Sequence, residues 1–320
     1  MPSFNSRAGK NPALNAFVPD SELFVLKPWI AIVALLADWG LIAMAFTCAI
    51  IWSHPIIYLM AALIIARSQL ALAVIMHDSA HGVLTTGQRL NDLLGQLCTA
   101  GPLFISLKTY RAGHLKHHQH PMQYDDPVAA VFGLADFPLP RRKLVTRLLV
   151  DLCGAGYFIS IFRFARGDYR TSMPKVDKSA RLKAWEVLTM LISNALLFGL
   201  LSWLGHPLLY PGLWLLPAIT LLPLMGRIRA IMEHAGLPAC DDQSQNARTI
   251  VCANWETFFF GPHAIHYHIE HHLYVRMPFY HLRRVHQQLA SKQLLSGKNI
   301  YKGYIAVLRD VSYPEFETLA

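Results

Sequence analysis

Long apolar stretches alternate with polar segments along the chain in two pairs. The apolar stretches are residues 29–52, 56–76, 185–204 and 208–225. Each has about the 20 residues that an α-helix needs to cross the apolar core of a bilayer. Short breaks, Ser53-His54-Pro55 and Gly205-His206-Pro207, separate the members of each pair. The pattern predicts two transmembrane helical hairpins and therefore an all-α integral membrane protein with four spans.

Two further apolar segments have a different character. Residues 93–107 are short and contain Gly101-Pro102, which favours a buried or re-entrant segment. Residues 144–165 carry Arg147 and Asp151 among apolar positions. Interspersed charges of this kind are typical of an amphipathic helix at a membrane interface. Neither segment is predicted to be a full span.

The composition and the distribution of charge support a membrane protein. Hydrophobic residues make up 53% of the 320 residues, charged residues only 15%, and the net charge is +9. Residues 1–28 contain three Lys or Arg, residues 77–184 fifteen and residues 226–320 ten, whereas the two breaks contain none. By the positive-inside rule, both termini and the central loop are predicted to be cytoplasmic. The net positive charge is then explained by the contact of the cytoplasmic segments with the membrane surface, and no nucleic-acid partner is predicted.

Eight of the 16 histidines lie in three short clusters. The clusters are His77 and His81 in HDSAH, His114, His117 and His118 in HLKHH, and His268, His271 and His272 in HIEHH. Offsets of three and four residues place imidazoles on one face of a helix. One transition metal takes at most about six ligands, and a catalytic site keeps a position open. Eight ligands would therefore indicate two metal ions, whereas the alternative is a hydrogen-bonded polar surface.

The residue types narrow the choice of metal. Neutral imidazole suits iron, copper and zinc. No H-E-x-x-H motif is present and the five cysteines are scattered, so zinc fits poorly. Copper leaves most of the histidines unexplained. Two irons with open positions for dioxygen fit best, and beside a membrane they would meet a chain dissolved in the bilayer.

The three boxes, in this order between two apolar hairpins, resemble those of the membrane fatty acid desaturase/hydroxylase superfamily. The resemblance implies a cytosolic helical cap that holds a non-haem di-iron centre, and a ninth histidine ligand before the last box, for which His234 is the candidate. It covers about residues 29–282 as a catalytic domain, between a polar cytosolic N-terminal segment (1–28) and a cytosolic C-terminal tail (283–320). The chain departs from the pattern at Ala230, where members often carry Asn, and at Val275, where Pro is frequent.

Three acidic residues adjoin the proposed ligands: Asp78, Glu233 and Glu270. Carboxylates that accept the second N–H of a metal-bound imidazole fix its tautomer and strengthen the ligand, and this role is predicted for all three. Asp125 and Asp126 follow the second box, and either this role or an ordinary turn or helix cap suits them.

The resemblance implies desaturation of a fatty acyl chain, with dioxygen as co-substrate. Hydroxylation, or formation of a terminal alkene or ketone, on the same scaffold is the alternative. No haem, iron–sulfur or nucleotide motif is present, so a separate ferredoxin, rubredoxin or cytochrome b5-like electron donor is predicted. Arg141, Arg142 and Lys143 suit either an acidic donor or anionic lipid head groups.

Asp38 and Arg67 fall inside predicted spans, where ionisable groups are costly and usually have a partner or a role. They either pair with each other or Arg67 lies at the mouth of a substrate channel. A multi-pass transporter or a haem membrane protein is a remote alternative, because the histidines cluster beyond the spans and haem needs only one or two axial histidines.

Overall fold

The computed structural model describes residues 12–166, 183–252 and 254–314, and most of these residues are helical. Its long helices are α2 (Pro28–Ile51), α3 (Pro55–Ala80) and α9 (Ala184–Trp203), followed by a π-helical turn at Tyr210–Leu215, α10 (Leu216–Ile219) and α11 (Leu221–His234). Tyr210–His234 counts as one segment. Within the described ranges, four helical segments are thus long and apolar enough to cross a membrane. The prediction of an all-α protein with four candidate spans is confirmed.

The second and fourth segments extend beyond their predicted ends. α3 continues to Ala80 instead of ending at residue 76, and the fourth segment reaches His234 instead of residue 225. Neighbouring elements bury the last turns of both helices, including His77 and His234. Because protein surrounds these last turns, both helices continue into polar residues instead of ending where the apolar stretch ends.

Local sequence explains the turn between α2 and α3. Pro55 occupies the first helical position of α3, where its missing N–H costs no hydrogen bond. Nδ1 of His54 accepts the N–H of Ile56 at 3.3 Å and caps the helix. The break predicted at Ser53-His54-Pro55 is therefore a capped helix start.

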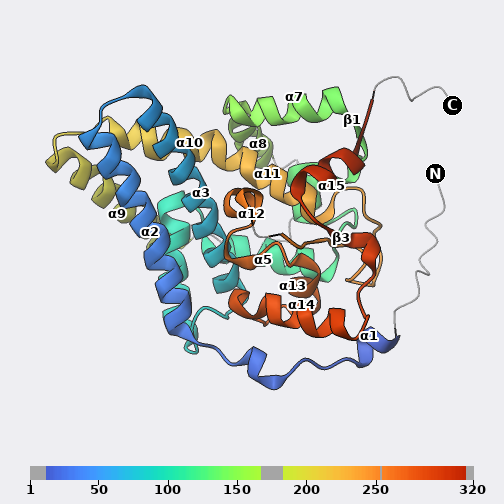
Figure 1. Ribbon diagram of the computed structural model, residues 1–320. Coiled ribbons are helices and arrows are strands. Elements are labelled where there is room, and N and C mark those ends of the chain that lie inside the picture. Colours follow the sequence, from blue (N-terminus) through green and yellow to red (C-terminus); the bar gives the residue numbers. More distant parts are fainter. Residues whose placement is uncertain (1–11, 167–182, 253, 315–320) are drawn as a thin grey trace.

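Shorter elements form a cap at one end of the long helices (Figure 1). The cap helices are α1 (Pro12–Ala16), α4 (Gln88–Gly95), α5 (Leu107–Gln119), α6 (Pro127–Phe132), α7 (Arg141–Leu152), α8 (Ala155–Arg166), α12 (Trp255–Phe260), α13 (His268–Leu273), α14 (Leu282–Ser291) and α15 (Tyr304–Asp310). The strands are β1 (Leu139–Pro140), β2 (Thr249–Ile250), β3 (Ile300–Tyr301) and β4 (Ser312–Tyr313). Short turns of 3-10 helix include Ser21–Phe24, Gly101–Leu103, Pro262–Ala264 and Phe279–His281.

Two short parallel strand pairs close the cap across large sequence separations. Leu139 is in register with Ser312 in the pair β1–β4, and Thr249 with Ile300 in the pair β2–β3. Val307 and Val311 share an apolar core with Ile231 of α11. The chain beyond the predicted domain boundary at 282 is thus packed into the cap; the boundary itself stays a prediction.

The two additional apolar segments take defined forms. Residues 88–103 fold as α4, a π-helical turn at Gln96–Ala100 and a 3-10 turn, and Asn194 of α9 donates to the carbonyl of Gly101 at 3.2 Å. The single amphipathic helix predicted at 144–165 is instead α7 and α8, bent by 87°. Gly154 lies at the bend with φ +80°, a conformation that glycine adopts without steric cost. The interfacial position stays a prediction.

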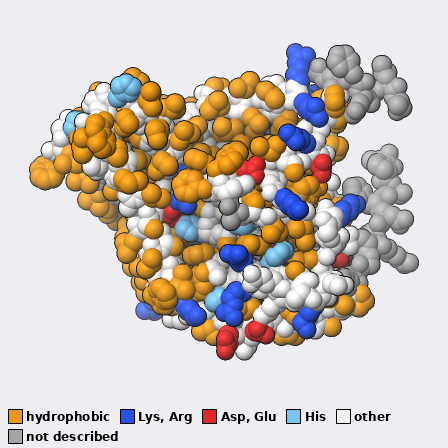
Figure 2. Space-filling model, viewed as in Figure 1, with side chains coloured by type: hydrophobic (Ala, Val, Ile, Leu, Met, Phe, Trp, Pro, Cys, Tyr) orange, Lys and Arg blue, Asp and Glu red, His pale blue; other side chains and the backbone are white. Residues whose placement is uncertain are grey.

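Hydrophobic side chains dominate the surface over α2, α9 and α10, whereas most charged side chains in this view lie over the cap (Figure 2). An ion pair joins α3 to α2. Arg67 donates to Asp38 at 2.6 Å, and both residues are buried. Nε2 of His263 lies 2.6 Å from the other oxygen of Asp38. The interpretation that Asp38 and Arg67 pair with each other is confirmed.

Candidate metal centre

Four helix segments from distant parts of the chain supply the nine predicted histidines. His77 lies in the last turn of α3 and His81 directly follows that helix. α11 ends at His234, and the three-histidine boxes lie on α5 and α13. Ser106 caps α5 by accepting the N–H of Thr109 at 3.1 Å. Both three-histidine boxes are therefore helical, as their spacing predicts.

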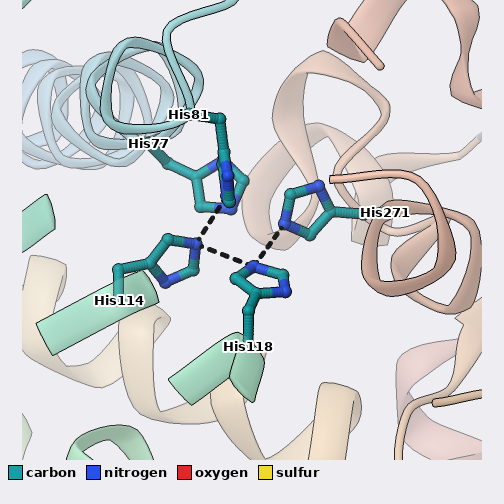
Figure 3. Close-up of side chains that lie close together, drawn as sticks. All are labelled: His77, His81, His114, His118 and His271. Carbon is teal, nitrogen blue, oxygen red and sulfur yellow. Dashed lines mark hydrogen bonds between the residues drawn. The ribbon is translucent and has the colours of Figure 1, made fainter. Parts of the chain in front are cut away.

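The nine histidines form two groups. The five-histidine cluster contains His77, His81, His114, His118 and His271, and the four-histidine cluster contains His117, His234, His268 and His272. Within each cluster, the ligand nitrogens lie within 4.8 Å of one another. Figure 3 shows the five-histidine cluster, with rings from different helices turned toward a common centre. The structure thus brings together all nine residues.

Each three-histidine box contributes to both clusters. On α5, His114 and His118 join the five-histidine cluster, while His117 joins the other. On α13 the division is reversed, since only His271 joins the five-histidine cluster. The two clusters adjoin, because the ring centroids of His118 and His272 are 4.3 Å apart. The H-x-x-H-H spacing therefore serves two adjacent sites from one helix.

The Nε2 atoms face one another closely. Nε2 of His118 lies 3.0 Å from that of His114 and 2.9 Å from that of His271. In the four-histidine cluster, Nε2 of His268 lies 2.9 Å from that of His234. Such convergence places several nitrogen lone pairs around one point.

Burial favours the neutral form of several of these imidazoles by lowering their pKa values. It lowers the pKa of His81 to about 4, with a further contribution from the positive charge of Arg111. Burial, followed by the neighbouring histidines, also holds the pKa values of a further set well below the usual range: His114, His118, His268, His271 and His272. A neutral imidazole is the form that binds metal.

Acceptors behind the rings orient several of them. Nδ1 of His117 lies 2.9 Å from both oxygens of Asp126, and Nδ1 of His77 lies 3.3 Å from Asp78. Nδ1 of His234 lies 2.7 Å from the carbonyl of Asn246. Because the Asp126 carboxylate and the Asn246 carbonyl only accept hydrogen bonds, Nδ1 of His117 and of His234 carries the proton, and their Nε2 atoms are left with a lone pair.

Asp126 combines the two roles that the sequence left open. Besides contacting His117, it accepts the N–H of Val128 at 2.8 Å and caps α6. Burial alone would raise the pKa of Asp126, but the hydrogen bonds from His117 and from the Met122 N–H lower it below its usual value. Asp126 is therefore held as a carboxylate beside His117.

The three acidic residues singled out in the sequence behave differently. Asp78 contacts His77 and also accepts the Phe279 N–H at 3.0 Å. Glu233 lies 3.5 Å from Nδ1 of His268. Glu270, in contrast, contacts His286 at 2.6 Å and Thr249, and so does not match the position predicted for it. Its backbone lies within α13, but the partners of its two carboxylate oxygens are Thr249 and His286 and not the boxed histidines.

Sequence reasoning missed Gln243 and Arg229. Oε1 of Gln243 accepts from Nδ1 of His272 at 2.8 Å, and its Nε2 donates to the carbonyl of His118 at 2.8 Å. Arg229 donates to Glu233 at 2.6 Å. Gln243 lies in a polar loop without a recognisable motif, so no local signal identifies it. The i,i+4 spacing of Arg229 and Glu233 would have suggested their ion pair.

Five other described histidines lie outside both clusters: His120, His263, His266, His281 and His286. Nδ1 of His266, for example, lies 2.7 Å from the carbonyl of Ile250.

The donor set fits metal. Nε2 of His77 is buried without a hydrogen-bond partner among the described residues, although it belongs to the five-histidine cluster. A buried polar nitrogen of this kind is costly unless something else satisfies it. Nine imidazoles without a thiolate suit iron and other borderline transition metals. The residues therefore fit the pair of irons expected from the sequence.

Comparisons with known proteins point the same way. A sequence model of the family described as "Fatty acid desaturase" matches residues 51–302, which include all nine histidines. The chain is similar to dihydrorhizobitoxine desaturase of Bradyrhizobium elkanii, with 26% identity over 294 residues that cover 86% of this chain and 77% of the relative. It is also similar to an sn-1 acyl-lipid omega-3 desaturase (ferredoxin) of Nostoc sp. (strain 36), with 22% identity over 228 residues that cover 66% of this chain and 61% of the relative.

Proposed function

The chain belongs to the fatty acid desaturase family, and from that premise we propose that it uses dioxygen to desaturate a fatty acyl chain at a pair of histidine-ligated irons. The observation that supports this most is the convergence of nine buried histidines into two adjacent clusters. The two relatives are named for different substrates but for the same kind of reaction. The name of the second includes an acyl lipid, which is the substrate class proposed for this chain.

The nine histidines would hold the irons through Nε2, with His77, His81, His114, His118 and His271 at one and His117, His234, His268 and His272 at the other. Asp78, Asp126, Gln243 and the carbonyl of Asn246 keep the Nδ1 protons in place. Such support raises ligand basicity and fixes ring orientation. When bound, the irons would supply the activation of dioxygen and the removal of hydrogen from an unactivated C–H bond.

The stoichiometry requires an external reductant. Forming one double bond removes two hydrogen atoms from the substrate, while reducing dioxygen to two waters takes four electrons. Two electrons and two protons must therefore come from elsewhere. The sequence carries no motif for a redox cofactor besides the histidines, so a separate donor of the ferredoxin, rubredoxin or cytochrome b5 class completes the reaction. The second relative is named with ferredoxin.

The four apolar segments would cross the bilayer, with the cap on the cytoplasmic side. The distribution of Lys and Arg supports this orientation. Because α3 and α11 are candidate spans that end at clustered histidines, the centre would lie close to the membrane surface. An acyl chain could then enter from the lipid phase while its head group stays at the interface.

Expression in a host without this activity, followed by mass spectrometry of its lipids, tests the reaction. Loss of two hydrogens from an acyl chain supports desaturation. Gain of one oxygen would instead identify a hydroxylase. Metal analysis of the purified protein should give about two irons per chain without haem absorbance; zinc alone, or haem, would reject the proposal.

A further inference from the structure

The two candidate spans that lead to the metal centre, α3 and α11, each carry a stripe of residues spaced three or four apart. The stripe on α3 consists of Ala66, Leu70, Ala73 and His77, and the stripe on α11 of Leu222, Gly226, Arg229 and Glu233. This spacing places each set on one face of its helix. Leu222 packs against Ala66 and Leu70 in one apolar cluster. The two stripes therefore contact each other inside the protein and run from there to the histidine clusters.

Small residues leave unfilled space along these stripes. Within residues 65–80 of α3, Ala73 alone is not fully buried. A Cβ added to Gly226 would meet no atom within 4 Å outside its own helix backbone. Ala73 lies one turn before His77, and Gly226 lies one turn before Arg229. Open space thus adjoins the last turns of both helices, next to the metal centre.

Arg229 presents unused hydrogen-bond donors beside this space. Its Nε donates to Glu233 at 2.6 Å, and its side chain is 14% exposed. Neither terminal nitrogen of the guanidinium has a hydrogen-bond partner in the described part of the chain. A guanidinium has five N–H donors, so four remain free. Because Glu233 already balances the charge, these donors favour an uncharged oxygen acceptor over an anion.

Arg229 lies close to both histidine clusters. Its partner Glu233 is 3.5 Å from Nδ1 of His268, which belongs to the four-histidine cluster. Burial raises the pKa of Tyr110, and the nearby positive charge of Arg229 opposes this rise. The ring of Tyr110 in turn stacks on His114 of the five-histidine cluster, with 5.4 Å between ring centroids. A substrate that reaches the irons through the open space would therefore pass the free donors of Arg229.

A plain hydrocarbon chain fits poorly beside these donors. It would displace water from the N–H groups without replacing the hydrogen bonds, and one hydrogen bond to a charged group changes affinity by roughly 10- to 100-fold. Sites with buried donors discriminate against substrates that lack the matching acceptor. The cost falls if the substrate itself carries an oxygen at this place.

We propose that Arg229 is a specificity-determining residue, whose terminal N–H groups donate to an ether, carbonyl or hydroxyl oxygen that the substrate carries near the carbon to be oxidised. The substrate class is then an oxygenated acyl chain instead of a plain one. This inference rests on the proposed function, since it assumes that an acyl substrate reaches the metal centre. It adds to that function a reason for selecting among acyl chains.

The test measures binding of fatty-acid probes to the iron-loaded full chain in nanodiscs without dioxygen, so that no turnover follows. The probes are stearic acid and its oxa analogues, in which an ether oxygen replaces one methylene at successive positions. At least one analogue should bind the wild type about 10-fold more tightly than stearic acid, and Arg229→Met should reduce this advantage to less than about 2-fold. Because the ratio compares two probes on the same variant, a general loss of stability cancels.

Gly226→Leu tests the space without removing the donors. Leucine suits a helix and would fill the open space, so every probe should bind about 10-fold or more weakly while the iron content stays unchanged. Gly199→Leu is the matched control. Gly199 also has no atom within 4 Å of an added Cβ, but it lies exposed on α9. This variant should bind the probes like the wild type.

If no analogue binds the wild type more tightly than stearic acid, water alone occupies the donors of Arg229 and the inference fails. An advantage that persists in Arg229→Met, or unchanged binding by Gly226→Leu, would also overturn it. The proposed function is judged separately, from the lipids of the expression host. A desaturated product there, without preference for any analogue, rejects the role of Arg229 alone. A hydroxylated product would reject desaturation and leave the binding preference readable.

Discussion

His118 and His272 belong to different histidine clusters, yet their ring centroids lie only 4.3 Å apart. Gln243 links them further, since it donates to the carbonyl of His118 and accepts from the ring of His272. The two proposed iron sites thus share a wall made of these three residues. A change in this wall should disturb both sites.

Replacing a histidine of the shared wall should reduce metal content as well as activity. His118→Ala removes an Nε2 that faces both His114 and His271. We expect iron to fall from about two to at most about one per chain, with loss of activity of about 100-fold or more. Iron analysis and product assays check this result. His120→Ala, exposed at the end of the same helix, is the control and should keep both irons.

Asp126 allows its two roles to be separated. Asp126→Asn keeps a good helix cap, whereas Asp126→Ala loses the cap as well, at a cost of about 1 kcal/mol. Both replace the carboxylate that contacts His117, so both should lower iron affinity or activity by about 10- to 100-fold. Chelator competition measures the affinity, and thermal unfolding measures the stability. An Asn variant with wild-type iron affinity would contradict the role assigned to Asp126.

The ion pair between Arg67 and Asp38 should matter for stability. Arg67→Ala leaves Asp38 buried with only His263 beside it. Breaking a buried pair from one side typically costs about 3–5 kcal/mol, whereas replacing both partners by apolar residues is far less harmful. The midpoint of thermal inactivation in detergent should fall for Arg67→Ala and largely recover for Arg67→Met/Asp38→Leu. The exposed Arg89→Ala serves as control, and a double variant no more stable than Arg67→Ala would contradict the expectation.

The iron-free protein should lose stability on acidification. Burial lowers the pKa of His81 to about 4, from a usual value of 6.5. Between these values the unfolded chain binds a proton at His81 that the folded chain does not, so the contribution of His81 to the free energy of unfolding falls as pH decreases from about 6.5 to 4 and levels off below. The other buried histidines of the clusters act in the same direction. Chemical denaturation of chelator-treated protein across this range measures the effect; stability that stays constant or rises on acidification would contradict it.

Much of the fold follows from local patterns. The apolar stretches predicted the four candidate spans because burial in lipid demands about 20 consecutive apolar residues. Their ends were predicted less well, since the last turns of α3 and α11 are enclosed by protein rather than lipid. The bend at Gly154 and the pairing of β1 with β4 depend on contacts between distant segments. A local pattern does not report such contacts.

The candidate site, too, was predicted from the sequence only where local patterns determine it. Histidine spacing predicted which residues share a helix face, and the structure brings all nine into two clusters. The resemblance, not the spacing, supplied His234. Gln243 reaches His272 from a loop with no motif. Glu270 lies between boxed histidines in sequence but contacts His286. Glu270 is two residues from His268 and from His272 on α13, and an offset of two residues is about 200° around a helix, so its side chain leaves α13 on a different face.

The register of β1 with β4 has a consequence for biosynthesis. Leu139 finds its partner only when Ser312 has been made, and Thr249 likewise waits for Ile300. Helices α2 and α3 can leave the ribosome and enter the bilayer long before either strand pair forms. A nascent chain that ends before Ile300 therefore lacks the β2–β3 pair, and one that ends before His268 also lacks the whole third histidine box, so both histidine clusters are completed late in synthesis.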